Sequence, residues 1–138
     1  MSSIPGKALA DAAAALCGTP FRLHGRHPAT GLDCVGLVAA ALTRCGRAVE
    51  VPEGYSLRAL SIAPLLGFAA RNGFHEADLL ASHAAGDLLL LRLSAIQAHL
   101  VIALDWDRFV HAHAGLGKVA ICPSDLPGET IARWRLKG

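Results

Sequence analysis

The second half of the chain holds five short apolar segments with no helical stretch between them. Turn-like residues such as Gly86 separate them. Parallel strands need long crossover connections, usually helices, so strands that follow one another this closely must pair antiparallel. The sequence therefore predicts an antiparallel meander of these segments, which are Asp87 to Leu93, Ala98 to Asp105, Arg108 to His113, Lys118 to Cys122 and Thr130 to Leu136.

The first half carries helical signals instead. An Ala-rich stretch over residues 5–16 is followed by Gly18, which is well placed to end a helix, and a helix is also expected over residues 64–72. Residues 19–32 are expected to form a loop, and residues 49–60 fit neither helix nor strand clearly. The predicted fold class is α+β, with N-terminal helices packed on an antiparallel sheet of about five strands.

Length and composition favour one folded domain over residues 1–138. The chain is 53% hydrophobic and 17% charged, which excludes an intrinsically disordered protein. The chain has thirteen Lys and Arg residues and eleven Asp and Glu residues. This excess of positive charge is too small to favour nucleic acid as a partner. Asp11 and Arg92 interrupt the longest apolar runs, so no membrane span is expected. Pro5 and Gly6 break what could be a signal peptide, so synthesis in the cytoplasm is expected.

Cys34 stands at the first turn of a nearly all-apolar helix that Asp33 is suited to cap. Free N–H groups and the helix dipole stabilise a thiolate at such a position, which favours a nucleophile with a lowered pKa. A buried structural thiol is the alternative for Cys34. No CxxC pair occurs, so neither a disulfide framework nor a cysteine zinc site is indicated. Buried structural roles are expected for Cys17, Cys45 and Cys122.

Three histidines offer a partner for such a thiol. His99 begins an apolar segment, and His111 and His113, at a spacing of two, should point to one face of the next strand. Antiparallel pairing would bring one of these two beside His99, which makes a Cys-His-polar relay possible. The same residues could bind a metal with Cys34 as fourth ligand, but no closing ligand pattern is present, so no metal or other cofactor is expected. The remaining histidines are expected at the surface: His24, His27, His75 and His83.

Four sequence blocks carry a family resemblance. They are GTPFRLHGRHPATGLDCVGLV at 18–38, AGDLLLLR at 85–92, AHLVIAL at 98–104 and FVHA at 109–112. In this order they resemble the signature blocks of the NlpC family of bacterial cell-wall cysteine peptidases. The resemblance implies a papain-like fold and a single catalytic domain. It also implies a triad in which Cys34 is the nucleophile, His99 the base and His111 the orienting third member.

The sequence departs from the family pattern around the nucleophile. Phe21 replaces the motif tyrosine, Val35 replaces the serine after the cysteine, and His24-Gly25 stands where the family has two glycines. These changes leave the triad intact and alter the substrate pocket. The residues expected to contact substrate are Phe21, Asp33, Val35 and His113.

The resemblance implies an activity and a route to the substrate. The family hydrolyses amide bonds of peptidoglycan stem peptides, typically between D-glutamate and a diamino acid, through a thioester. The short form without a signal resembles the phage-tail and gene-transfer-particle branch, which implies carriage to the wall by a phage-like particle and its proteins. Two alternatives stay open: an amidase or acyltransferase acting on another amide or ester, and a catalytically silent wall-binding or tail-structural module.

Overall fold

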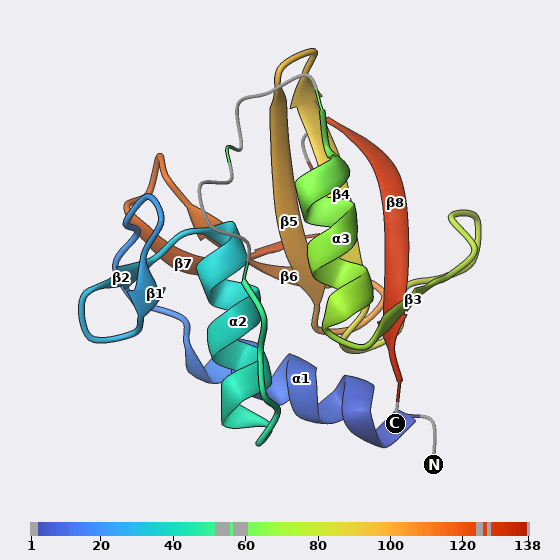
Figure 1. Cartoon of the computed structure of the whole chain (residues 1–138), viewed down its shortest axis with the longest axis horizontal. Helices are drawn as coiled ribbons and strands as arrows, with labels where there is room; N and C mark the ends of the chain where they lie inside the picture. The colour runs from blue at the N-terminus through green and yellow to red at the C-terminus, as the bar shows by residue number, and fades with distance from the viewer. Residues whose placement is uncertain (1–2, 52–55, 57–60, 124–125, 127, 138) are drawn as a thin grey trace.

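In the computed structural model, three helices pack on a six-stranded antiparallel sheet, within the part of the chain that the structure describes, residues 3–51, 56, 61–123, 126 and 128–137 (Figure 1). The helices are α1 (Ser3–Ala15), α2 (Cys34–Arg44) and α3 (Ala63–Arg71). The sheet strands are β3 (Phe74–Glu76), β4 (Leu88–Ser94), β5 (Gln97–Ala103), β6 (Arg108–His113), β7 (Lys118–Pro123) and β8 (Glu129–Leu136). A small separate pair is formed by β1 (Arg26–His27) and β2 (Gly31–Leu32).

The strand order in the sheet is β3-β8-β4-β5-β6-β7. Strands β4 to β7 form the predicted meander, and the α+β class is confirmed. The expectation of a full meander is wrong for β8, which returns across the sheet to pair with β4 instead of β7. Strand β3 was not predicted, because three residues are too short for an alternating pattern to stand out. The loop expected over residues 19–32 contains the β1–β2 pair.

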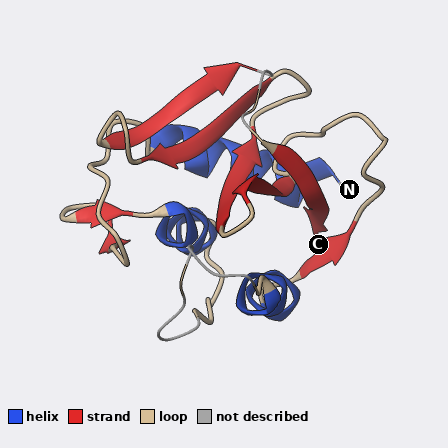
Figure 2. Cartoon of the chain, turned by 90° about the horizontal axis from the view of Figure 1, so that it is seen from above, coloured by secondary structure: helices blue, strands red, loops and turns tan. Residues whose placement is uncertain are grey.

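Helix α2 is the centre of the core. Nine of its residues, from Cys34 to Leu42, are buried, and it contacts α1, β5 and β6. Seen from above, α2 and α3 lie side by side against the same side of the sheet (Figure 2). Alternate residues of β4 point to opposite faces, so Leu90 joins the core under the helices and Leu89 joins a smaller apolar cluster on the other face with Phe109. Burial on both faces explains why β4 is almost wholly apolar.

The first turn of α2 is fixed by its N-cap. The Asp33 carboxylate accepts a hydrogen bond from the Gly36 N–H at 2.8 Å and a second from the His24 N–H at 2.9 Å. A Cβ at Gly36 would overlap the Gly25 carbonyl oxygen, so this close approach requires glycine. His24 has φ 58°, a left-handed conformation that costs a non-glycine residue roughly 1 kcal/mol. The 22–25 turn is therefore tied to the helix turn that carries Cys34.

Several cysteines and histidines lie where the sequence did not place them. All four cysteines are free; Cys17 is exposed, and Cys45 and Cys122 are half-buried, so their expected burial is wrong. Their positions explain this, since they lie past the end of α1, at the C-cap of α2 and on the edge strand β7. His83 is half-buried against the Phe109 ring, at 5.2 Å between ring centroids, whereas His24, His27 and His75 are exposed as expected.

Among the helices of the described residues, none is both long and apolar enough to cross a membrane.

Candidate active site

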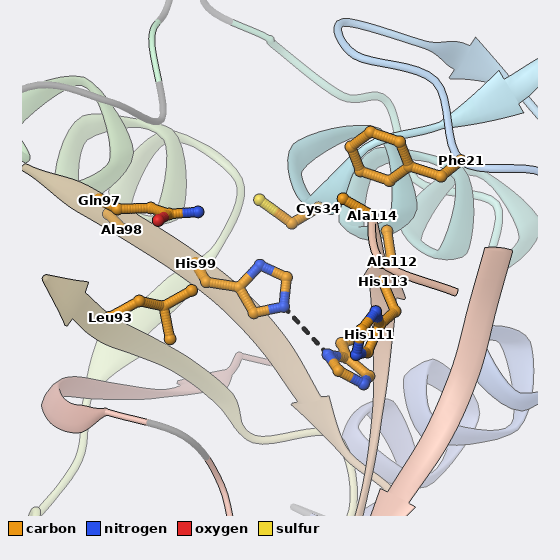
Figure 3. Close-up of a pocket in the computed structure, with 11 residues that line it drawn as sticks. Phe21, Cys34, Leu93, Gln97, Ala98, His99, His111, Ala112, His113 and Ala114 are labelled. Atoms are coloured by element: carbon orange, nitrogen blue, oxygen red, sulfur yellow. Dashed lines mark hydrogen bonds between the residues drawn. The ribbon is translucent and has the colours of Figure 1, made fainter. Parts of the chain in front are cut away.

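A pocket of about 250 Å³ opens where the first turn of α2 meets β5 and β6 (Figure 3). It brings Cys34, His99 and His111 into one site, with Phe21 and His113 also in its wall. The remaining wall is mostly apolar. Because α2 supplies the cysteine and two neighbouring strands supply the histidines, the relative positions of the three groups are set by the packing of the core.

Strands β5 and β6 part as they approach this pocket. Their paired residues are Ile102 with Val110 and Ala103 with Phe109, at the end away from the histidines. If that register continued, His113 would stand opposite His99. Instead the His99 Nε2 lies 3.1 Å from the His111 Nδ1, within hydrogen-bond distance. One histidine of the pair thus lies beside His99 as expected, and it is His111.

The hydrogen bonds restrict where the ring protons can be. The His99 Nδ1 faces the side of the pocket where Cys34 lies (Figure 3). A ring that accepts a thiol proton at Nδ1 would carry its own proton on Nε2, where the His111 Nδ1 is within hydrogen-bond distance to accept it. His113 accepts the Leu116 N–H through Nδ1 at 3.0 Å, which leaves its own proton on Nε2. The contact between His99 and His111 is compatible with the tautomer that a base at Nδ1 needs.

Burial dominates the protonation of the thiol. Cys34 is 1% exposed, and burial raises the pKa of its thiol to about 12. The Asp33 charge acts in the same direction as burial, and the Leu100, Val35 and Cys34 N–H groups oppose it without offsetting it. The expected lowering of the thiol pKa by the helix start is therefore wrong for the empty pocket. The resting cysteine is a neutral thiol.

The histidines are held neutral by the same cause. Burial, together with the smaller effects of the nearby His111 and His113, lowers the pKa of His99 to about 4. Burial also lowers the pKa of His111, with His113 contributing. At neutral pH the site thus contains a thiol at Cys34 and an uncharged imidazole at His99.

The low pKa of His99 predicts a loss of stability in acid. The unfolded chain, with a histidine pKa near 6.5, binds more protons than the folded chain below that pH, so stability falls between pH 6.5 and pH 4. We expect a decrease of about 2–3 kcal/mol in the free energy of unfolding from pH 7 to pH 4. Urea unfolding at both pH values checks this. His99→Gln should remove most of this decrease. If that variant loses as much stability as the wild type between pH 7 and pH 4, the loss is not caused by protonation of His99.

Two of the residues expected to contact substrate do not line this pocket. Asp33 and Val35 are both fully buried and do not line the pocket; Asp33 caps α2 and Val35 belongs to the core. Phe21 and His113 do line it. Gln97 was missed and also lines the pocket. Its position two residues before His99 on β5 was the signal, since such residues share a side of a strand.

The described residues contain no group of three His, Cys, Asp or Glu side chains arranged to hold a metal ion. The facing nitrogens of His99 and His111 are joined to each other, and the His113 Nδ1 accepts a backbone N–H. Their lone pairs therefore do not converge on a common point.

Solved structures share this fold. An NlpC/P60 family protein from Bacillus cereus matches with a TM-score of 0.70 and 19% identity over 96% of this chain and 40% of its own. The NlpC/p60 domain of the peptidoglycan hydrolase SagA matches with a TM-score of 0.63 and 22% identity, over 94% of this chain and 97% of its own. The P60 domain of an M. avium subspecies paratuberculosis antigen matches with a TM-score of 0.65 and 18% identity, over 100% of this chain and 99% of its own. This chain thus spans less than half of the first protein and nearly all of the two domains.

No curated protein matches the sequence. The family model described as NlpC/P60 family matches residues 18–129, which include the capped α2 and the strands that carry the three pocket histidines. The match covers most of the chain, and the solved NlpC/P60 structures share its sheet and helices. The chain belongs to the NlpC/P60 family.

Proposed function

We propose that this chain is a cysteine peptidase that hydrolyses amide bonds in peptidoglycan stem peptides. The observation that carries the proposal is the site itself: one pocket holds Cys34, His99 and His111, and the His99 Nε2 lies within hydrogen-bond distance of the His111 Nδ1. Family membership and the fold shared with the NlpC/p60 domain of a peptidoglycan hydrolase support a cell-wall substrate.

The proposed reaction starts from the neutral Cys34 thiol and the neutral His99 imidazole. The Cys34 sulfur attacks the amide carbon while the thiol proton passes to the His99 Nδ1, and the carbonyl π electrons move to the oxygen. The Cys34 N–H, at the start of α2, would bind that oxyanion. As the C–N bond breaks, His99 returns the proton to the leaving amine. Water then attacks the thioester, with His99 as base, and restores the thiol.

His111 is proposed as the positioning residue for His99. His111→Ala removes the acceptor for the Nε2 proton, so we expect kcat to fall about 10²–10³-fold through loss of the correct tautomer. In His111→Asn the side-chain oxygen can stand near the position of Nδ1 and accept the same proton, so about tenfold of the loss should be recovered. Rates against pH for both variants check this. Equal activity of the two variants contradicts a positioning role.

The bond between D-glutamate and a diamino acid is the proposed cleavage site. The apolar pocket wall, which includes Phe21, Leu93 and Ala112, favours one second candidate, an amidase or acyltransferase acting on an apolar acyl group. Mass spectrometry of products from muropeptides, simple amides and acyl esters separates the two: turnover of muropeptides alone supports the peptidase, and turnover of the other substrates alone supports the second. Cytoplasmic synthesis and carriage by a phage-like particle stay predictions.

A further inference from the structure

Gln97 places a free carboxamide in the wall of the catalytic pocket. It stands at the start of β5, two residues before His99, and its side chain is exposed. Figure 3 shows the nitrogen end of the carboxamide directed toward the side of the pocket where the Cys34 sulfur lies. Within the described part of the chain the carboxamide makes no hydrogen bond, so its NH₂ group is available to a bound molecule.

The other wall residues offer few donors. Phe21, Leu93 and the alanines of the wall have no polar side-chain atom. His99 and His111 are joined to each other by the hydrogen bond between the His99 Nε2 and the His111 Nδ1. Gln97 therefore offers an uncharged donor on the Cys34 side of the pocket that makes no hydrogen bond within the described part of the chain.

We propose that Gln97 is a further catalytic residue, whose Nε2–H donates a hydrogen bond to the carbonyl oxygen as Cys34 attacks and that oxygen becomes negative. The proposal rests on the cysteine-peptidase function above. The Cys34 N–H would supply one hydrogen bond to the oxyanion and Gln97 the second. A donor of this kind binds the developing charge more tightly than the ground-state carbonyl, so it acts on kcat more than on KM.

Gln97→Ala and Gln97→Glu test the proposal, with Ile96→Ala as the matched control. Ile96 lies beside Gln97 in the chain, is 45% exposed and does not line the pocket. We expect Gln97→Ala to lower kcat about 10- to 100-fold with KM within about threefold. Gln97→Glu should be slower still, because its carboxylate cannot donate and repels the oxyanion. Ile96→Ala should match the wild type, and thermal unfolding should be unchanged in all three.

Two substrates keep this proposal distinct from the peptidoglycan assignment. Muropeptides report the proposed function, and 4-nitrophenyl acetate reports acylation of Cys34 whatever the natural substrate is. A drop in kcat for either substrate in both Gln97 variants supports the proposal, even if the wild type leaves muropeptides intact. Unchanged kcat in Gln97→Ala for every substrate that the wild type turns over overturns it, and so does a loss that appears only as a higher KM.

Discussion

Replacing Cys34 by alanine should abolish amide hydrolysis and leave the fold intact. The variant loses the only sulfur that lines the pocket within the described residues, so no thioester can form. Loss of a covalent nucleophile lowers kcat by at least about 10⁴-fold in enzymes of this kind. The substitution keeps Cβ and removes a single buried atom, so the change in unfolding free energy should be about 1 kcal/mol or less.

Cys17→Ala is the matched control for this prediction. Cys17 is a free, exposed thiol outside the pocket, so its removal should change neither rate nor stability. The measurement is kcat on muropeptides, with circular dichroism and thermal unfolding on the same samples. Activity in Cys34→Ala equal to that of the wild type would rule out the proposed nucleophile. An inactive wild type that still binds the cell wall would instead favour the silent module.

Asp87→Ala should be the most destabilising single change that the structure indicates outside the site. Asp87 is buried, accepts the Ala84 N–H at 2.9 Å and pairs with Arg135 at 3.1 Å. It also lies 3.8 Å from Arg133, which is 2% exposed. Without this carboxylate the Arg133 guanidinium is left buried with its charge uncompensated. Breaking such a pair costs about 3–5 kcal/mol, which should lower Tm by about 10–20 °C.

Asp11→Ala is the control for Asp87→Ala, because it removes an exposed carboxylate instead of a buried one. Asp11 also pairs with a cation, Lys7, at 2.8 Å, but both side chains are about two-thirds exposed. Exposed pairs add little to stability, so no measurable change is expected. Thermal unfolding of the two variants side by side is the check. Equal, small shifts in Tm would show that the Asp87 carboxylate does not hold Arg133 in the fold.

Much of the fold could be predicted because its signals are local. Helix α2 has a capping residue, helical spacing and a terminating glycine, and β4 to β6 are apolar runs between turn residues. The partner of β8 could not be predicted, because pairing with β4 depends on the whole sheet rather than on the β8 sequence. Strand β3 exists because it pairs with β8, which no pattern within its own three residues could show.

The site was predictable in its components and less so in its electrostatics. The spacing of His111 and His113, together with the family resemblance, predicted which groups form the site, and the structure brings Cys34, His99 and His111 together. The thiol pKa was misjudged because its main cause is burial by residues distant in the sequence, which outweighs the local effect of the helix start. Gln97 lies in none of the matching motif blocks, so only its place on β5 could have indicated it.

Digestion of a purified muropeptide by the wild type and by Cys34→Ala tests the central claim most directly. We expect the wild type to release two fragments whose masses add up to the substrate plus one water, and Cys34→Ala to release neither. The same fragments released at the same rate by Cys34→Ala, or a muropeptide left intact by the wild type, would contradict it.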